Sequence, residues 1–386
     1  MSKQVYLDYN STTPVDPEVY QAMQPYFLDS FGNASSVNHQ FGVQAKAAID
    51  HSRKIIAHAV GCRTKEIIFT GSATESINLA IKGIANSSDN PLKKIITLRS
   101  EHKAVLDTLE YMSELGIEVE LLDVDEQGYI DLDNLNESID KNTILVAILH
   151  GNNEIGTIQP IKKIGAMCEQ FGIPLFVDGA QTFGKISLDV KEMNIALFAG
   201  SGHKIYGPKG VGFLYKRDDI HIPPLLHGGG HEQGYRSGTH NIPGIVGLGK
   251  AAELALSDIS GNSMMLEKLS KLFLDTIDQE NIDYSINGPI INRLPGNLNL
   301  CFHGVESDWL ILHTPSIAIS TGSACTSETI TPSHVLRAIG LKNDDINSSV
   351  RISFGNYTKE DEAVRAAKDI AASVRKYIKK KEEIFA

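Results

Sequence analysis

Short apolar runs alternate with helix-like stretches through the middle of the chain, from about residue 65 to residue 216. The runs are rich in β-branched residues and almost continuously hydrophobic, as expected for strands that are buried on both faces. They cover residues 66–70, 94–98, 119–124, 144–149, 174–179, 195–200 and 210–216. This alternation predicts an α/β fold with a mostly parallel sheet and helices on both of its faces. Ligands of such sheets bind beyond the carboxyl ends of the strands.

Helical patterns flank this region on both sides. Asp16-Pro17-Glu18 predicts a helix start, because a capping side chain precedes a proline in the first turn. A four-residue repeat follows and predicts one packed face, formed by Val19, Met23 and Phe27. Near the other end, Thr358 and Asp361 resemble a capping box. The apolar stripe of the helix after it consists of Val364, Ala367, Ala371, Val374 and Ile378.

These patterns predict three parts of the chain. Residues 1–15 are expected to form an N-terminal segment that packs with a small domain, and residues 16–255 a large domain. Residues 256–386 are expected to form that smaller α+β domain, which carries the segment around Cys325. A long helix that begins in residues 244–256 is expected to join the two domains.

Composition and charge narrow the functional classes. The 386 residues carry a formal net charge of −11, which argues against nucleic acid or an anionic membrane as the main partner. No apolar run approaches the ~18 residues that a membrane span needs, and we expect no targeting segment at the N-terminus. The four cysteines form no CxxC pair and are too scattered for a disulfide framework. A cytoplasmic, reducing location is therefore expected, with no metal site.

Three candidate functional features follow predicted strands. In TGSATES (70–76), the hydroxyls of Ser72 and Thr74 and the free N–H groups of a helix start can bind a phosphate, or simply cap the helix. Asp178 ends an apolar strand, where a carboxylate can cap a helix or pair with a protonated ring nitrogen. Lys204, in GSGHKIYGPKG, can be a surface lysine or a desolvated Schiff-base lysine.

The order of these features along one sheet predicts a cofactor. A phosphate cradle, a carboxylate and a lysine are the parts that pyridoxal 5′-phosphate needs. The phosphate anchors the cofactor, Asp178 keeps its ring nitrogen protonated, and Lys204 binds its aldehyde carbon. A P-loop is excluded, because no GxxxxGK[ST] string occurs.

The chain closely resembles the cysteine desulfurases of the NifS/IscS-like class, which are class V, fold-type I pyridoxal-phosphate enzymes. The resemblance covers nearly the whole chain and rests on motifs that occur in the order of that family. They are YLDYNSTTPVDPEV, FTGSATESINLAIKG, HGNNEIGTIQPI, VDGAQTFGK, SGHKIYGPKGVGFLY, HGGGHEQGYRSGTHN, STGSACTS and SSVRISFG. It implies a homodimer that converts L-cysteine to L-alanine and passes the sulfur to an acceptor protein, such as an iron–sulfur scaffold or a tRNA-thiolation carrier.

The resemblance implies a role for each matching residue. Lys204 would be the Schiff-base lysine, Asp178 would pair with the ring nitrogen, and Gln181 would bind the phenolic oxygen. His102 would stack on the ring and act in acid–base catalysis, although a helix cap is the alternative. The other residues expected at the cofactor are Ala73, Thr74, Asn153, Ser201, His203 and, from the neighbouring subunit, Thr239.

The substrate carboxylate would bind to Asn153 and Arg351, where a planar guanidinium offers the bidentate geometry that a lysine lacks. Arg351 can instead be an ordinary cation at a strand edge.

The segment STGSACTSETITPS (320–333) is rich in Ser, Thr and Gly and has no helical or alternating period, which predicts an exposed, mobile loop. A cysteine is usually a small buried hydrophobe, which fits Cys62, Cys168 and Cys301. It does not fit Cys325, whose neighbours offer nothing to pack against. The resemblance makes Cys325 the thiolate that accepts the substrate sulfur as a persulfide.

Three alternatives stay open. The first is a selenocysteine lyase or another fold-type I lyase or aminotransferase. The second is a zinc site formed by His227, His231 and His240 near Glu232, although three consecutive glycines disfavour the helix it needs. The third is an inactive scaffold that only binds partners.

Overall fold

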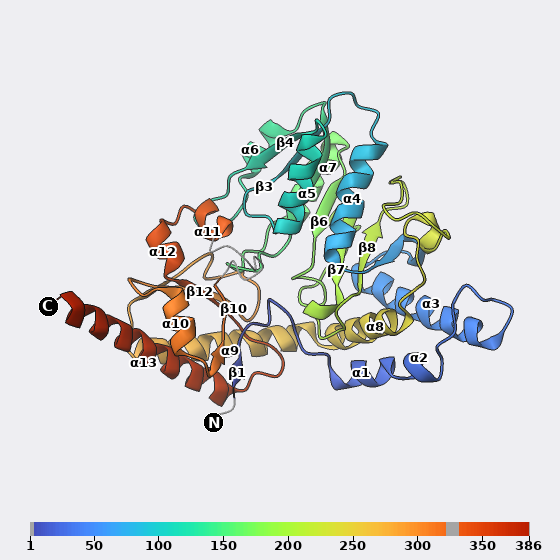
Figure 1. The fold of residues 1–386 in the computed structure, drawn as a ribbon. Helices are drawn as coiled ribbons and strands as arrows, with labels where there is room; N and C mark the ends of the chain where they lie inside the picture. The colour runs from blue at the N-terminus through green and yellow to red at the C-terminus, as the bar shows by residue number, and fades with distance from the viewer. Residues whose placement is uncertain (1–3, 322–331, 386) are drawn as a thin grey trace.

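The computed structural model describes residues 4–321 and 332–385, so Cys325 lies outside the described residues. Its central element is a seven-stranded sheet with the strand order β2-β8-β7-β6-β5-β3-β4 (Figure 1). The strands are β2 (Ile67–Thr70), β3 (Lys94–Leu98), β4 (Glu118–Leu122), β5 (Thr143–Leu149), β6 (Leu175–Asp178), β7 (Leu197–Ser201) and β8 (Gly212–Lys216). Strand β8 is antiparallel to both of its neighbours, and the other pairs are parallel. The predicted α/β fold with a mostly parallel sheet is confirmed.

Helices cover both faces of this sheet, because consecutive residues of its buried strands point to opposite faces. Ile68 and Leu145 pack in one core with α4 (Ala73–Ser87) and α5 (Lys103–Glu114). Their neighbours Phe69 and Val146 pack in a second core on the other face. The helices of that second core are α1 (Pro17–Met23), α3 (Gln40–Val60), α6 (Leu132–Ser138), α7 (Ile161–Phe171) and α8 (Ile242–Ser257).

A further hydrophobic core surrounds a smaller antiparallel sheet of order β12-β10-β9. Its strands are β9 (Tyr284–Ile286), β10 (Asn297–Phe302) and β12 (Ser349–Ser353), and its helices are α9 (Ile259–Gln279), α10 (Ser307–His313) and α13 (Glu360–Phe385). The N-terminal segment joins this core, because β1 (Val5–Tyr6) pairs with β11 (Ile317–Ala318) and Leu7 is fully buried. The domain boundaries given above stay a prediction.

Two short helices, α11 (His334–Ala338) and α12 (Asn343–Asn347), follow the undescribed segment. They form a small core with Ile155, a residue that lies beyond β5 of the large sheet. This core therefore connects the chain that follows β5 to the smaller sheet, which α12 contacts at β10. No helix within residues 4–321 or 332–385 combines the length and the apolar character needed to cross a membrane.

Three details of the predicted helices are wrong. The long helix from residue 244 is two helices, because Asp258 is not helical and its carboxylate caps α9 by accepting from the Gly261 N–H at 2.8 Å. The four-residue repeat ends at Met23, since Pro25 begins a separate helix, α2 (Pro25–Leu28), and Phe27 is 58% exposed.

At the last helix, Thr358 accepts from Gly355 in the preceding loop and does not cap α13. Glu362 accepts from the Lys359 N–H instead, at 3.1 Å. The predicted stripe is otherwise largely buried, but its last member, Ile378, is 40% exposed.

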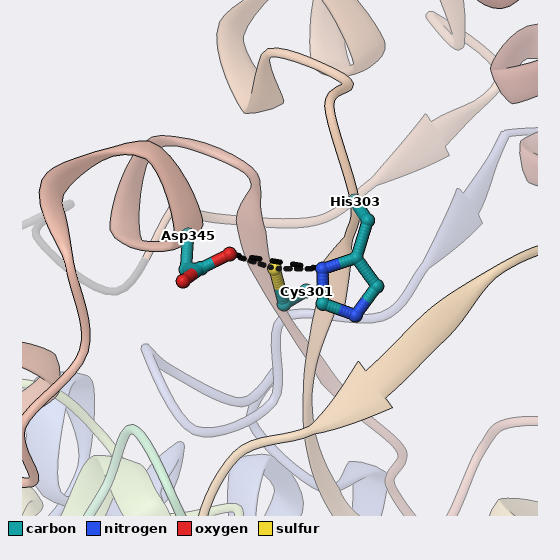
Figure 2. A group of neighbouring side chains, drawn as sticks. All are labelled: Cys301, His303 and Asp345. Atoms are coloured by element: carbon teal, nitrogen blue, oxygen red, sulfur yellow. Dashed lines mark hydrogen bonds and ion pairs between the residues drawn. The ribbon is translucent and has the colours of Figure 1, made fainter.

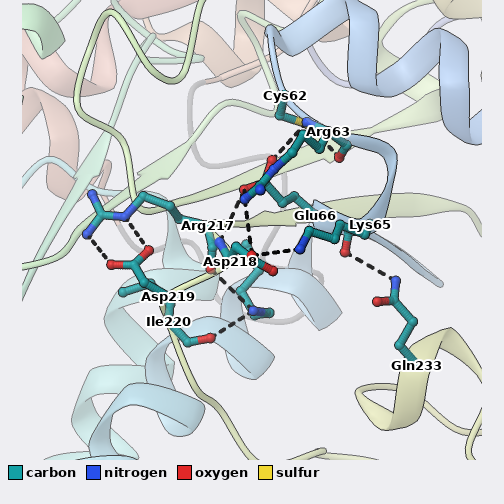
Figure 3. A network of polar contacts seen from close by, with 10 residues as sticks. Cys62, Arg63, Lys65, Glu66, Arg217, Asp218, Asp219, Ile220 and Gln233 are labelled. Atoms are coloured by element: carbon teal, nitrogen blue, oxygen red, sulfur yellow. Dashed lines mark hydrogen bonds and ion pairs between the residues drawn. The ribbon is translucent and has the colours of Figure 1, made fainter.

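A network of charged side chains fastens the outer strand β2 to the end of β8 (Figure 3). Glu66, which is buried just before β2, accepts from Arg63 Nη2 at 2.8 Å and from the Asp218 N–H at 3.2 Å. Asp218 in turn pairs with Lys65 at 2.7 Å. Exposed pairs of this kind contribute little to stability, so the network mainly fixes how β2 enters the sheet.

Candidate active site

Lys204 lies at the carboxyl end of the large sheet, in the turn η2 (Gly202–Lys204) that directly follows β7. The small residues before it are needed for close packing, since a Cβ on Gly200 would come within 2.2 Å of the Phe213 ring. The Lys204 Nζ donates to the backbone oxygens of Asn10 at 2.7 Å and Ser11 at 2.6 Å. Lys204 is therefore held at the strand ends and does not extend into solvent.

The N-terminal residues 8–13 connect this lysine to the smaller sheet. The Asp8 carboxylate accepts a hydrogen bond from Arg351 Nη2 at 2.7 Å, and two residues later the chain reaches the carbonyls that hold Lys204. Thr13 then donates to the backbone oxygen of His203 through both its N–H, at 3.0 Å, and its hydroxyl, at 3.1 Å. One short segment thus contacts the predicted cofactor lysine and the predicted substrate arginine.

Asp178 is the last residue of β6 and is only 2% exposed. Its Oδ1 accepts from the Ala180 N–H at 3.0 Å, at the start of a turn and not of a helix. Burial raises the pKa of Asp178, while the nearby His102 and Lys204 act to lower it. The structure therefore brings the carboxylate, the lysine and the histidine of the prediction into one electrostatic neighbourhood.

His102 caps α5, as the alternative from sequence allowed. Its Nδ1 accepts from the Ala104 N–H at 3.1 Å. Because Nδ1 accepts this bond, the proton of the neutral ring is assigned to Nε2. Nδ1 therefore caps the helix, and Nε2 stays available for an acid–base role.

Gln181 is buried and belongs to a chain of hydrogen bonds that ends at Lys204. Its Nε2 donates to the Asn10 oxygen at 2.8 Å, which is the same oxygen that accepts from Lys204. Its Oε1 accepts from Lys185 Nζ at 3.2 Å. Burial, and secondarily the charge of Lys204, lower the pKa of Lys185 to about 7. Lys185 and Lys204 also line one cavity of about 80 Å³ between α8 and α9.

The N-terminus of α4, where Ala73 and Thr74 form the first turn, lies one strand away from Ser201. Gly212 of β8 separates them, because it pairs with Thr70 on one side and with Ser201 on the other. A Cβ on Gly212 would come within 2.7 Å of the Gly200 oxygen and 2.8 Å of the Ser72 carbonyl carbon. Glycine is therefore required to keep α4 this close to β7.

His203 follows Ser201 and completes this group. Its Nδ1 lies 3.1 Å from the Thr12 hydroxyl. Burial lowers the pKa of His203 to about 4, helped by the charges of Lys204, Lys209 and Lys185. The ring is therefore neutral at neutral pH and can act as an uncharged hydrogen-bond donor.

Thr239 is exposed, in a segment that Arg236 ties to α4 through Glu75 at 2.8 Å. The histidines of the zinc alternative are close by but have other partners. Both ring nitrogens of His231 form hydrogen bonds, with Ser35 and with the Gly238 N–H, and His240 binds Glu232 at 2.6 Å. Burial alone would raise the pKa of Glu232, but His240 and Arg53 lower it to about 2. This cluster is an ion-pair network, and His227 is exposed outside it.

Arg351 lies on β12 and is 3% exposed, which excludes an ordinary surface cation. Its Nη2 binds Asp8, and its Nη1 lies 3.4 Å from the backbone oxygen of Asn153. The buried Nε of Arg351 has no hydrogen-bond partner within the part of the chain that the structure describes. Arg351 and Asn153, distant in sequence, are thus brought together as predicted for the substrate carboxylate.

Both ends of the undescribed segment are attached beside these residues. At its start, Ser320 accepts from the Arg351 N–H at 2.6 Å. At its end, Ser333 donates to Glu154, the neighbour of Asn153, at 2.6 Å. The next residue, His334, lies with Nε2 2.8 Å from the backbone oxygen of Glu101, which precedes His102.

Comparison with known proteins identifies the family. Residues 5–365 match the family model of class-V aminotransferases. The chain belongs to the class-V aminotransferase family.

Its relatives place it in one branch of that family. It is 46% identical over 374 residues to "Cysteine desulfurase IscS" of Rickettsia rickettsii, covering 96% of this chain and 91% of that protein. Among solved structures, it matches a "NifS-like protein" with a TM-score of 0.89 and 35% identity, over 96% of this chain and 98% of the other. It matches "SspA in complex with cysteine" with a TM-score of 0.81 and 39% identity, over 92% and 100%. Within the class-V aminotransferases the chain belongs to the cysteine desulfurases, as the sequence motifs indicated.

Pyridoxal 5′-phosphate is the cofactor of this family, and the residues present fit it. The close approach of α4 to β7 places a helix N-terminus, a favourable position for a phosphate, beside Ser201, and the buried Asp178 suits a cationic ring nitrogen. The unpartnered Nε of Arg351 adds a donor for an anion beside the same segment as Lys204.

Sequence analysis missed Lys185, Asn10 and Glu101. Glu101 is fully buried, and burial holds its pKa well above the usual range. Its Oε1 accepts from the Leu149 N–H at 2.7 Å. Asn10 and Glu101 carry no local signal, because their partners lie tens to hundreds of residues away along the chain. Lys185 has a partner four residues away, Gln181, but its burial depends on the tertiary fold.

Proposed function

We propose that this chain removes sulfur from L-cysteine, releases L-alanine and carries the sulfur on Cys325 to an acceptor protein. The observation that carries the proposal is the arrangement of Lys204 and Arg351 around residues 8–13, with both ends of the segment that contains Cys325 attached beside Arg351, Asn153 and His102.

The chain's own residues would divide the work as follows. Arg351 binds the substrate carboxylate, and its buried Nε supplies an unused donor. Asp178 holds the proton on the ring nitrogen of the cofactor, which when bound accepts the electrons released at the substrate Cα. Lys204 takes the Cα proton, and Nε2 of His102 donates or accepts protons near the substrate sulfur.

The sulfur step balances without an outside oxidant. The Cys325 thiolate forms an S–S bond with the substrate sulfur while the substrate C–S bond breaks, and a proton takes the place of sulfur on the carbon. The carbon is reduced and the sulfur is oxidised. In the sequence, Cys325 is five residues from Ser320, whose backbone oxygen accepts from the Arg351 N–H, and five residues span at most about 18 Å.

The variant Cys325→Ser tests this role. Wild-type enzyme given L-cysteine should form alanine and gain the mass of one sulfur atom on Cys325. The variant should keep the visible absorbance of the cofactor and form no alanine. Cys62→Ser, which changes a partly exposed thiol, should behave like wild type. Normal alanine formation by Cys325→Ser would overturn the proposal.

Measuring both enzymes on L-selenocysteine tests the lyase alternative, because C–Se cleavage does not require a protein thiol.

We further propose a cytoplasmic homodimer whose sulfur acceptor is an iron–sulfur scaffold or a tRNA-thiolation carrier. The described cysteines are all unpaired, which suits a reducing compartment. Transfer of ³⁵S from the labelled enzyme to purified candidates of each kind would separate the two acceptors.

A further inference from the structure

Three side chains that can bind metals converge on the smaller sheet (Figure 2). Cys301 lies on β10, His303 follows two residues later, and Asp345 comes from α12. Phe302 packs in the core, so its strand neighbour Cys301 faces the other side of β10, and His303, in the turn after β10, lies with its Nδ1 near Cys301 and Asp345. The function proposed above uses none of these residues.

The spacing of the three ligand atoms is nearly equal. Cys301 Sγ lies 3.7 Å from His303 Nδ1 and 3.8 Å from Asp345 Oδ1, and these last two atoms are 3.7 Å apart. An N–H···O hydrogen bond usually spans about 2.7–3.2 Å, so the contact between His303 and Asp345 has the length of an ion pair and is longer than a direct hydrogen bond.

The same spacing suits a metal ion. The centre of such a triangle lies about 2.1 Å from each corner, close to the roughly 2.0–2.3 Å of zinc bonds to nitrogen, oxygen and sulfur. One thiolate, one imidazole and one carboxylate form a mixed donor set, which favours a borderline ion such as Zn²⁺ over Mg²⁺ or Ca²⁺.

We propose that Cys301, His303 and Asp345 form a binding site for a zinc-like divalent cation, with water as the fourth ligand. This site differs from the histidine cluster considered from sequence and departs from the expectation of no metal site.

The surroundings of the cluster hold the ligands in position. Cys301 is fully buried, and its backbone pairs with Ser349 on one side and Ser285 on the other. The Ser349 hydroxyl donates to the backbone oxygen of Asp345 at 2.6 Å and accepts from Asn287 at 2.9 Å. Such outer contacts fix α12 against β10, as the supporting residues of metal sites do.

The cluster is also accessible to solvent and lies apart from the predicted catalytic residues. The side chains of His303 and Asp345 are 40% and 43% exposed, so an ion can arrive from solvent. Cys301 lies four residues along β10 from Asn297, which contacts the backbone of Asn153, and this corresponds to about 13 Å. A bound ion would link α12 to the smaller sheet without touching the predicted catalytic residues.

Cobalt titration of the holoenzyme tests the proposal, because tetrahedral Co²⁺ with a thiolate ligand has a characteristic visible spectrum. All proteins should carry Cys325→Ser, so that a catalytic thiol does not bind the ion. This background should bind one Co²⁺ per chain, and Zn²⁺ should displace it. Cys301→Ser should abolish the thiolate signature, and His303→Ala and Asp345→Asn should each weaken binding by more than about tenfold.

Cys62→Ser in the same background is the matched control and should leave the spectrum and affinity unchanged. His303 and Asp345 are partly exposed, so their variants test the site even if Cys301→Ser fails to fold. Zn²⁺ should also raise the thermal unfolding midpoint of the background protein and not that of Asp345→Asn. Unchanged cobalt affinity in the His303 and Asp345 variants, or the absence of a thiolate-bound spectrum in the background, would overturn the proposal.

Discussion

Single side chains at the carboxyl edge of the sheet are held by partners that the local sequence does not reveal. The order of residue types along the chain identifies Lys204 and Asp178 only as a lysine and a carboxylate at strand ends. Their environment depends on Asn10 and Lys185, which reach the site through the fold. At this scale the sequence therefore predicts the chemical groups, and the structure adds the hydrogen bonds that orient them.

Lys185→Met should alter the pH dependence of the enzyme. Because burial lowers the pKa of Lys185 to about 7, the variant should lack any change of cofactor absorbance with a midpoint near that pH. Loss of the bond to Gln181, worth about 0.5–1.5 kcal/mol, should lower activity roughly 2–10-fold. A pH titration of the absorbance measures the first effect. Lys163→Met, on the exposed side of α7, should change neither quantity, and a variant of Lys185 with the wild-type pH profile would contradict this role.

Glu101→Gln should make stability less dependent on pH. Burial raises the pKa of Glu101 well above its usual range, so the folded state binds this proton more tightly than the unfolded state. The wild-type free energy of unfolding therefore falls as pH rises from about 4.5 toward the folded pKa, by up to about 1.4 kcal/mol per pH unit.

Glutamine removes this loss and can still accept from Leu149. Urea unfolding at pH 5 and pH 8 should show that the stability of the variant relative to wild type increases with pH. Glu118→Gln, at an exposed position, should show no such increase. An equal difference between variant and wild type at both pH values would mean that Glu101 has no raised pKa.

Arg351→Lys should weaken substrate binding more than cofactor binding. A lysine keeps the charge but loses the fork of donors, and a hydrogen bond to a charged group is worth about 1.5–3 kcal/mol. The KM for L-cysteine should rise about 10–100-fold with an unchanged cofactor spectrum. Steady-state kinetics measures this, and an unaltered KM would remove Arg351 from the substrate site.

The strands of the large sheet were predicted more accurately than the ends of the helices. Six strands of the large sheet could be found because both of their faces are buried, which leaves an almost continuous apolar run, whereas the outer strand β4 is only partly buried. The helices were less certain, because a single residue such as Asp258 or Pro25 ends one helix and begins another without breaking the apolar pattern. Cys301, His303 and Asp345 could not be grouped from sequence, since α12 reaches β10 only through the tertiary fold.

Gly212→Ala tests the contact between α4 and β7. A Cβ would collide with the Gly200 oxygen and the Ser72 carbonyl, so the helix start should shift and hold the cofactor phosphate less well. We expect about tenfold weaker cofactor retention, measured by its release on dilution. Gly210→Ala is the control, because its φ of +77° makes alanine strained while nothing lies within 4 Å of the added Cβ. That variant should lose stability but retain cofactor, and equal retention in both variants would argue against a tight α4 contact.

The protein is expected to function as a homodimer. Thr239 is exposed in the single chain, as a residue that completes the site of a neighbouring subunit must be. Light scattering on the purified holoenzyme should give twice the chain mass of 42.1 kDa. A mass of one chain with full activity would show that Thr239 is not shared.

Residues 8–13 connect the large sheet directly to the smaller sheet. The carboxylate of Asp8 accepts a hydrogen bond from the guanidinium of Arg351. The backbone carbonyls of Asn10 and Ser11 accept hydrogen bonds from the amine of Lys204. A substrate that competes with Asp8 for the guanidinium would loosen the same stretch and set the amine free. Binding of the amino-acid substrate and release of the Lys204 amine would then be thermodynamically coupled, so that each favours the other by the same factor.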